Sequence, residues 1–522
     1  MIPPHSVAPL TGRLPPADPA SAELTLALRE VFDAPRDRIL WDAGQGRALS
    51  SAIGMALAAA RLGQSRRVVA VIGDAALSAG MAFEALNHAG ALTADLLVIL
   101  DDRHLSIEED LGALSNRLVR ALSGRLYAHL REGGKRMLSK MPTVRELARR
   151  SEEHLKGMVL PGTLFEEMGF NYIGPAHGHD APALVKTLRN LQQLRGPQLL
   201  HVVTGHAAGG EGRKRRSAAK GGRKRGAAIS DEAGGSYARM FGQWLCDIAA
   251  ADERVVAITP GRRAGMAEFA RRFPERFFDV ALAEQHAVTF AAGLATQGLK
   301  PVVAMNSTLL QRGYDQLIHD VALQELPVTF AVATPEASFD LSYLRCIPGL
   351  VVMAPADENE CRQMLTMASK LDGPAVVRHA LDGPGVKPAA PLTTLAVGRA
   401  QLRREGGSGL ALLVFGAPLA AAVPVAERLD ATLVNMRFVK PLDAELVAAL
   451  AATHQAVVTI EDNALAGGAG SAVGELLAAT AQRLPQLHLG LPGRLDEASL
   501  RRQIEDWWEA QVQTPQRSAG AA

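Results

Sequence analysis

The chain has 522 residues, 48% of them hydrophobic and 21% charged, and a formal net charge of +2. These values are typical of a soluble protein with several domains, and they exclude a disordered or strongly charged chain. No run approaches the ~18 uninterrupted apolar residues of a membrane-spanning helix, and the proline-rich start lacks the regions of a signal peptide. The three cysteines are widely separated, which argues against a disulfide framework or a zinc site. We therefore expect a cytoplasmic protein without a membrane partner, with Cys346 and Cys361 buried as small hydrophobic residues.

Short apolar runs rich in β-branched residues recur along the chain, separated by longer helical patterns. They lie at residues 66–73, 94–100, 197–204, 253–259, 300–305, 326–333, 409–416, 431–437 and 455–462. Runs of this kind, without polar alternation, indicate parallel strands that are buried on both faces by helices. The sequence therefore predicts an α/β fold built from three parallel-sheet units.

Two segments divide these runs into three groups. Residues 205–235 are rich in glycine, alanine, lysine and arginine and show no apolar periodicity, so we predict a flexible linker there. A second boundary, rich in proline and glycine, lies near residues 381–394. The predicted domains are therefore residues 1–204, 236–385 and 395–522.

The predicted linker carries a basic run. Residues 212–226 contain eight lysine or arginine residues and no acidic residue. A run of this kind can bind nucleic acid or another polyanion by releasing counterions. Because aromatic side chains that would stack on bases are absent from the run, a solvated linker is the simpler interpretation. We therefore do not expect nucleic acid as a partner, and polyanion binding stays open as the alternative.

The turn after the first of these strands offers a place for a ligand. We interpret residues 68–72 as a buried strand and residues 77–89 as a helix, which places Gly73 to Ala76 at the carboxyl end of a strand. Open parallel sheets bind their ligands at that edge. A diphosphate can accept hydrogen bonds from the N–H groups that begin the helix, while Asp74 directs its carboxylate at a divalent cation. The simpler alternative is that Asp74 caps the helix or belongs only to the turn.

The stretch GDAALSAGMAFEALNHAG, followed by LLVILDDRHLSIEEDLGALSNRL, resembles the thiamine-diphosphate-binding region of the 1-deoxy-D-xylulose-5-phosphate synthase family. The later stretches FDVALAEQHAVTFAAGLATQGLKPVVA, LLQRGYDQLIHDVALQELPV and FDLSYLRCIPGLVVMAPADENECRQML resemble the same transketolase-type family, in its order, and the resemblance runs from about Leu24 to Trp508. It implies a homodimer of three-domain chains. The domains would be a diphosphate-binding domain, a pyrimidine-binding domain and a C-terminal transketolase-like domain.

The resemblance also implies an activity and the residues that carry it. The family condenses pyruvate with glyceraldehyde 3-phosphate, with loss of CO₂, and uses thiamine diphosphate and Mg²⁺ as cofactors. Its product feeds isoprenoid, thiamine and pyridoxal phosphate synthesis. Glu284, in LAEQHAVTF, matches the glutamate that binds the aminopyrimidine ring of the cofactor. Asp74 matches a magnesium ligand, between Gly73 and Ala75 at the diphosphate. Arg312 matches an arginine of the substrate-phosphate site.

Two residues near the predicted diphosphate site depart from the family pattern. Arg103 stands where the family has a second oxygen ligand for the metal, and an arginine offers only donors and a fixed positive charge. Asp101, two positions earlier, would replace that ligand only if the loop moved, and alternatively Arg103 pairs with the diphosphate directly. Ala75 stands where the family has glycine, and it would be strained by roughly 1 kcal/mol if its φ angle were positive.

Several loops that surround the family's reaction centre have no counterpart in this chain. Histidine-bearing segments are absent after residues 44 and 204, and the acceptor-site loop is compressed to residues 333–338. Thr334 and Leu381 stand where the family has phosphate-binding arginines. Two hypotheses therefore stay open. One is an active thiamine-diphosphate enzyme, and the other is a catalytically impaired or inactive scaffold with a structural or regulatory role, which pairs with an intact homologue.

Overall fold

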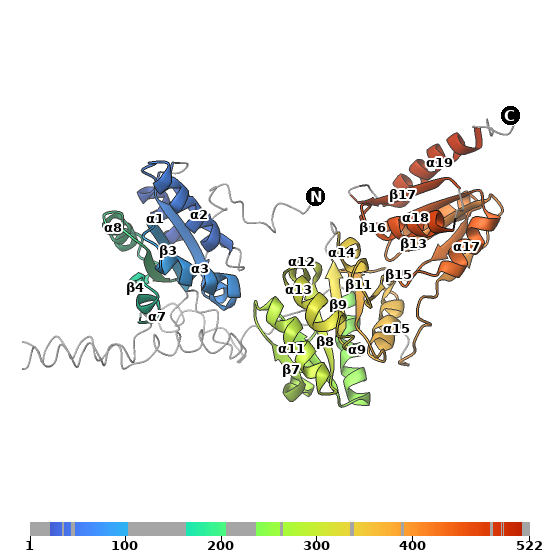
Figure 1. Cartoon of the computed structure of the whole chain (residues 1–522), viewed down its shortest axis with the longest axis horizontal. Helices are drawn as coiled ribbons and strands as arrows, with labels where there is room; N and C mark the ends of the chain where they lie inside the picture. The colour runs from blue at the N-terminus through green and yellow to red at the C-terminus, as the bar shows by residue number, and fades with distance from the viewer. Residues whose placement is uncertain are drawn as a thin grey trace, which may run out of the picture. The chain divides into compact units, whose positions relative to one another are not determined.

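The computed structural model describes residues 21–33, 36–42, 47–102, 163–204, 236–261, 265–334, 339–387, 391–480, 484–491, 493 and 495–513 (Figure 1). These residues form two compact bodies. The first body holds the described residues up to 204, and the second holds most of those from 236 onward. None of the helices in these ranges is long and apolar enough to cross a lipid bilayer. Arg103 and the predicted linker 205–235 lie outside the described residues.

A five-stranded parallel sheet forms the centre of the first body. Its strand order is β1-β2-β3-β5-β4, and every neighbouring pair is parallel. The strands are β1 (Arg38–Trp41), β2 (Val68–Gly73), β3 (Leu96–Asp102), β4 (Asn171–His177) and β5 (Gln198–Val203). Because consecutive side chains of a strand point to opposite faces, the five apolar residues that begin β2 contribute to two separate cores.

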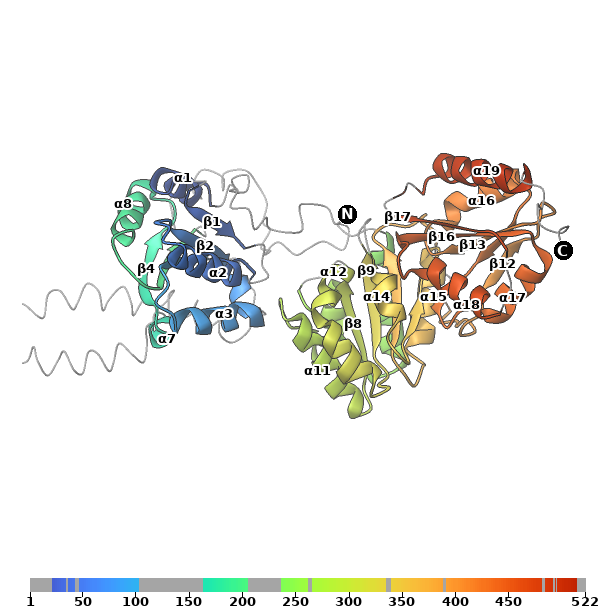
Figure 2. The same cartoon turned by 45° about the horizontal axis from the view of Figure 1, so that its top comes forward.

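Helices cover both faces of this sheet (Figure 2). One core contains Val68, Ala70 and Ile72 of β2 together with residues of α2 and α3, and the other contains Val69 and Val71 together with residues of α1 and α8. The helices of this body are α1 (Ala22–Val31), α2 (Arg47–Arg61), α3 (Gly80–Gly90), α7 (Thr163–Glu167) and α8 (Ala181–Leu191). A parallel sheet with both faces covered is the arrangement that the apolar runs predict.

The second body contains two sheets. The first of them has seven strands in the order β15-β10-β11-β9-β8-β6-β7. Its strands are β6 (Val255–Thr259), β7 (Phe277–Asp279), β8 (Lys300–Asn306), β9 (Thr329–Thr334), β10 (Val351–Met353), β11 (Ala375–Ala380) and β15 (Phe438–Lys440). Its α-helices are α9 (Ser236–Ala251), α10 (Ala267–Arg272), α11 (Glu284–Thr296), α12 (Ser307–Leu310), α13 (Tyr314–Gln316), α14 (Asp340–Arg345) and α15 (Glu358–Ala368). Residues of α9 and α15 pack together with the sheet in one core, which includes Trp244, Phe269 and Met364.

The last sheet has five strands in the order β12-β14-β13-β16-β17. They are β12 (Gln401–Arg404), β13 (Leu410–Phe415), β14 (Thr432–Asn435), β16 (Ala456–Ala464) and β17 (Gln486–Leu491). Figure 2 shows α16 (Leu419–Arg428) and α19 (Glu497–Gln513) on one face and α17 (Ala444–Thr453) and α18 (Ala469–Ala479) on the other. Leu419, Leu500 and Ile504 join the strands in the core below α16 and α19.

The α/β class is confirmed, and each of the nine apolar runs overlaps a strand. The sequence analysis missed other strands among the described residues, namely β1, β4, β7, β10, β11, β12, β15 and β17. Two strand pairs, β10 with β15 and β12 with β14, are antiparallel, and both lie at the edge of a sheet. The expectation for Cys346 is wrong, because its side chain is exposed while Cys246 and Cys361 are buried.

Candidate functional site

The turn around Asp74 lies at the carboxyl end of β2, where the sequence places it. Gly73 ends the strand in an extended conformation, with φ −78° and ψ 160°, and is aligned with Asp101 of β3. A 3₁₀-helix then spans Asp74–Ser78, and α3 begins at Gly80 rather than at residue 77. The N–H groups of two short helical segments therefore follow the strand, instead of those of one continuous helix.

The strain considered for Ala75 does not arise. Ala75 lies inside the 3₁₀-helix Asp74–Ser78, and a 3₁₀-helix is formed with negative φ angles. Among the described residues, the non-glycine positions with positive φ are Ala281, Glu325, Asp430 and Arg437. Alanine is therefore compatible with the backbone of this turn. A Cβ atom at Gly73 would also meet no atom of the described residues within 4 Å, so these residues leave the space beside the end of β2 open.

Asp101 is engaged in hydrogen bonds within the first body. Its side chain is buried, and it accepts hydrogen bonds from the hydroxyl of Ser21 at 2.7 Å and from that of Thr204 at 2.5 Å. The two donors contact different carboxylate oxygens. Asp101 would have to give up these contacts to replace the metal ligand that the family carries at position 103. No group of three potential metal ligands occurs within the described ranges.

A second buried polar chain connects β3, β5 and β4. The Nε2 atom of His201 lies 3.1 Å from a carboxylate oxygen of Asp102, and its Nδ1 atom lies 2.8 Å from the hydroxyl of Tyr172. The His201 side chain is fully buried. Both ring nitrogens therefore have a partner, as burial of an imidazole requires. The sequence analysis missed this chain, because its three residues come from strands that only the fold brings together.

Glu284 and Arg312, which the sequence analysis selected for different roles, contact each other. Glu284 begins α11 with only 2% of its surface exposed. Arg312 lies in the 3₁₀-helix Gln311–Gly313, and its side chain is 14% exposed. The Nη1 atom of Arg312 is 3.1 Å from Oε1 and 3.0 Å from Oε2 of Glu284. The guanidinium therefore compensates the charge of the carboxylate in a nearly water-free position.

A glycine lets the two segments approach. A Cβ atom at Gly313 would lie 3.0 Å from Cγ2 of Val288 and 3.3 Å from the carbonyl oxygen of Glu284. The 3₁₀-helix that carries Arg312 is therefore in backbone contact with the first turn of α11. The turn at Asp74 belongs to the first body and this ion pair to the second.

Thr334 and Leu381, which stand where the family has phosphate-binding arginines, differ in burial. Leu381 is 50% exposed. Thr334 is buried and donates a hydrogen bond of 2.5 Å to Asp340. The Nε atom of Arg378 lies 3.1 Å from Asp340, and its Nη1 atom lies 2.6 Å from Asp462. Arg378 thus joins the seven-stranded sheet to β16 of the last sheet through a buried ion pair with Asp340 and a partly exposed one with Asp462.

The side chain of Glu461 binds the first N–H groups of α18. Its carboxylate accepts hydrogen bonds from the N–H groups of Ala469 at 2.7 Å and Gly470 at 2.8 Å. Burial opposes the charged form and raises the pKa of the Glu461 carboxyl to about 7. In the sequence, the only signal for this carboxyl is weak: the apolar run 455–462 ends in the acidic pair Glu461 and Asp462.

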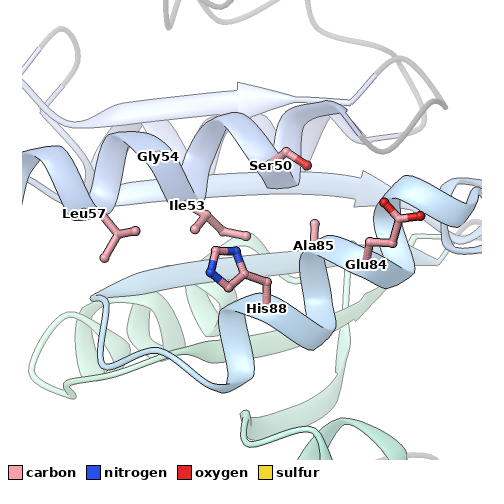
Figure 3. Close-up of a pocket in the computed structure, with 7 residues that line it drawn as sticks. All are labelled: Ser50, Ile53, Gly54, Leu57, Glu84, Ala85 and His88. Carbon is pink, nitrogen blue, oxygen red and sulfur yellow. The ribbon is translucent and has the colours of Figure 1, made fainter.

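A cavity of about 430 Å³ opens between α2 and α3 (Figure 3). Ile53 and Leu57 of α2 face His88 and Ala85 of α3 across it, and Ser50 and Glu84 lie at one end. Its lining is largely apolar, and none of the predicted site residues contributes to it.

The fold and these residues define a transketolase-type protein. Three family models match the chain in order: 1-deoxy-D-xylulose-5-phosphate synthase at residues 43–204, the pyrimidine binding domain of transketolase at 234–380 and the C-terminal domain of transketolase at 398–513. Among solved structures, one described as "Split gene transketolase, inactive beta4 tetramer" matches 53% of this chain and 97% of its own chain, with 27% identity and a TM-score of 0.48.

Curated relatives narrow the class to one family. A 1-deoxy-D-xylulose-5-phosphate synthase of Thioalkalivibrio sulfidiphilus is 52% identical over 550 residues, which cover 93% of this chain and 85% of the relative. One from Aeromonas hydrophila is 48% identical over 567 residues, covering 94% and 91% respectively. The chain belongs to the 1-deoxy-D-xylulose-5-phosphate synthase family, whose members are thiamine-diphosphate-dependent transferases that use pyruvate and glyceraldehyde 3-phosphate.

The same comparison bears on the missing loops. The alignment with the Thioalkalivibrio relative extends over 550 residues, although the chain has only 522 and contributes 93% of them. The relative therefore carries stretches without a counterpart in this chain.

Proposed function

We propose that this chain catalyses the reaction of its family, the condensation of pyruvate with glyceraldehyde 3-phosphate with loss of CO₂. The observation that carries the proposal is the placement of Glu284, a buried carboxylate at the first residue of α11, within a motif that matches the family. A cofactor ring that bears a weakly basic nitrogen needs such a carboxyl, held in place and shielded from water.

The residues at both predicted contact points are compatible with thiamine diphosphate. Gly73 leaves open space at the end of β2, where N–H groups of the Asp74–Ser78 helix and of α3 follow. Such groups favour a diphosphate. Glu284 supplies the carboxyl for the aminopyrimidine ring, and Ala75 is tolerated without strain. When bound, thiamine diphosphate supplies the nucleophilic carbon that permits decarboxylation of pyruvate and transfer of the two-carbon unit. The protein's own contribution is to bind, orient and exclude water.

Three further assignments belong to this proposal. Residues 1–204 would bind the diphosphate, residues 236–385 the pyrimidine, and residues 395–522 would form the transketolase-like C-terminal domain. The order of the three matched family models supports this division. A homodimer and a cytoplasmic location are proposed on the family resemblance alone.

Magnesium is proposed at Asp74, but the described residues supply only part of a site for it. Asp74 is the one predicted ligand, because both oxygens of Asp101 accept hydroxyl hydrogen bonds and Arg103 lies outside the described ranges. We derive no step of the reaction through the metal.

The test is a calorimetric titration of the full chain with thiamine diphosphate, with and without Mg²⁺, followed by assays of CO₂ release and of the condensed product. We expect saturable binding that strengthens with Mg²⁺, and product formation that Glu284→Gln abolishes while the cofactor still binds. An exchange at Asp74, Asp74→Asn, should weaken the effect of Mg²⁺. Absence of binding at millimolar cofactor would overturn the proposal.

The second candidate, which rests only on the departures of the sequence from the family pattern, is a non-catalytic scaffold that pairs with an intact homologue. This candidate predicts that the chain binds no cofactor and forms no product. It also predicts that the chain co-purifies with an active synthase when both are expressed. A chain that binds no cofactor and never associates with the intact enzyme would remove this candidate too.

A further inference from the structure

We propose that Arg312 is a positioning residue that acts through Glu284, and that it is not a ligand of the substrate phosphate. The inference deepens the proposed function and rests on the role proposed there for Glu284. Its basis is the contact of one guanidinium nitrogen with both carboxylate oxygens, at 3.1 and 3.0 Å.

Burial makes this contact energetically important. The side chains of Glu284 and Arg312 are 2% and 14% exposed, so neither charge is well solvated. A buried carboxylate is tolerated when it is paired and hydrogen-bonded, and removal of one partner leaves an uncompensated charge. Arg312 therefore allows Glu284 to stay buried where the cofactor ring is expected.

The backbone fixes the geometry of the pair. Gly313 lies against Val288 and the carbonyl oxygen of Glu284, and a Cβ atom at this position would be a tight contact that forces these neighbours to shift. The chain that carries Arg312 is thus anchored on the same helical turn that carries Glu284. A guanidinium that starts from a fixed backbone holds the carboxylate in one orientation, as placement of a catalytic group requires.

The same contact disfavours a phosphate ligand. A dianionic phosphate is recognised by several donors with uncompensated positive charge, commonly a group of arginines. The charge of Arg312 is already balanced by Glu284, and the positions of two other family arginines hold Thr334 and Leu381.

The two roles predict different kinetics. A phosphate ligand contributes only when the acceptor carries a phosphate, so its loss reduces the preference for glyceraldehyde 3-phosphate over unphosphorylated glyceraldehyde. A residue that positions Glu284 also affects the steps at pyruvate, which are common to the reactions with both acceptors. Its loss lowers kcat with both acceptors and leaves their ratio of kcat/KM nearly unchanged.

The experiment compares Arg312→Gln and Arg312→Lys with the unsubstituted chain, and it measures CO₂ release and product formation with each of the two acceptors. We expect Arg312→Gln to lower CO₂ release at least about tenfold, with the acceptor ratio kept within about threefold. Arg312→Lys should recover part of the rate, because it retains the charge. Arg271→Gln, at an exposed ion pair with Glu268, is the matched control and should change nothing. The inference would be overturned if the ratio of kcat/KM for glyceraldehyde 3-phosphate to that for glyceraldehyde fell strongly while the rate of CO₂ release stayed unchanged.

Folding of the cofactor-free chain gives a readout that does not depend on activity. Unfolding in urea is measured for Glu284→Gln, Arg312→Gln and the double variant. We expect Arg312→Gln to reduce the folding equilibrium constant at least about tenfold and the double variant to recover most of that loss. Additive effects would overturn the inference. If the chain makes no product at all, the proposed function fails, while this cycle still decides whether Arg312 supports Glu284.

Discussion

At the scale of single residues, Glu461 combines burial with two strong hydrogen bonds. Its pKa is raised from 4.5 to about 7, so the folded chain retains a proton that the unfolded chain releases. The corresponding stability is fully present below pH 4.5 and is lost as the pH rises through about 7. Because the pKa differs by about 2.5 between the two states, this proton contributes about 3 kcal/mol to the free energy of unfolding at low pH.

We therefore expect the free energy of unfolding to decline from pH 5 to pH 8 more steeply in the unsubstituted chain than in Glu461→Gln. Glutamine cannot titrate and has one acceptor oxygen for the two N–H groups, so the variant should be less stable at pH 5 and less sensitive to pH. Urea unfolding at several pH values measures both slopes. Parallel profiles would show that another group causes the decline.

Tyr172 gives a second prediction at this scale. Tyr172→Phe removes the hydroxyl that lies 2.8 Å from Nδ1 of the buried His201 and leaves that nitrogen without its partner. We expect a loss of about 1–2 kcal/mol in the free energy of unfolding. The stacking of residue 172 on Phe165, with ring centroids 6.1 Å apart, should persist because the ring is retained. Unchanged stability would mean that water replaces the hydroxyl.

At the scale of elements, α3 ends in direct backbone contact with the segment that follows α7. A Cβ atom at Gly90 would lie 1.5 Å from the carbonyl oxygen of Met168, so an alanine there forces the two segments apart. We expect Gly90→Ala to destabilise the first body by about 1–3 kcal/mol. Gly54, within α2, has nothing within 4 Å of its Cβ position, so Gly54→Ala should stabilise by about 0.5–1 kcal/mol. Thermal unfolding of both variants tests the contrast, and shifts of the same sign would contradict it.

The elements also show what the sequence can predict. The nine apolar runs are strands because an interior strand of a covered parallel sheet has little choice of composition. β15 has only three residues, and β12 has no buried residue, so neither shows an apolar pattern. β11 contains Arg378, whose charge is compatible with a buried strand only because Asp340 and Asp462 lie beside it.

The candidate site was predictable to a similar extent. Glu284 and Asp74 could be identified from the sequence, because each lies in a stretch that matches the family. The contact between Glu284 and Arg312 spans 28 positions and depends on the approach that Gly313 allows. The partners of Asp101 lie 80 and 103 positions away. Contacts of this kind follow from the packing of elements, which local patterns do not encode.

At the scale of the whole molecule, Arg378 connects two sheets of the second body. Its guanidinium, 2% exposed, pairs with Asp340 and Asp462, and these charges raise its pKa above the usual arginine value although burial opposes this. Arg378→Met would leave the fully buried Asp340 without its cation. We expect a loss of about 3–5 kcal/mol and separate unfolding transitions for the two sheets, measured by calorimetry.

The matched control is Arg399, which is 56% exposed and pairs with Glu445 and Asp443. Arg399→Met should change the free energy of unfolding by less than about 1 kcal/mol, because exposed ion pairs contribute little. A single cooperative transition in Arg378→Met would show that other contacts couple the sheets.

The position of β15 has a consequence for synthesis and truncation of the chain. β15 pairs with β10 and occupies an edge of the seven-stranded sheet, although it comes after β12, β13 and β14 of the last sheet in the chain. A fragment that stops near residue 385 would leave the backbone of β10 uncovered, and an open strand edge invites aggregation. On the ribosome, the seven-stranded sheet likewise stays incomplete until residue 440 has emerged, so the nascent chain passes through a stage in which this edge needs protection.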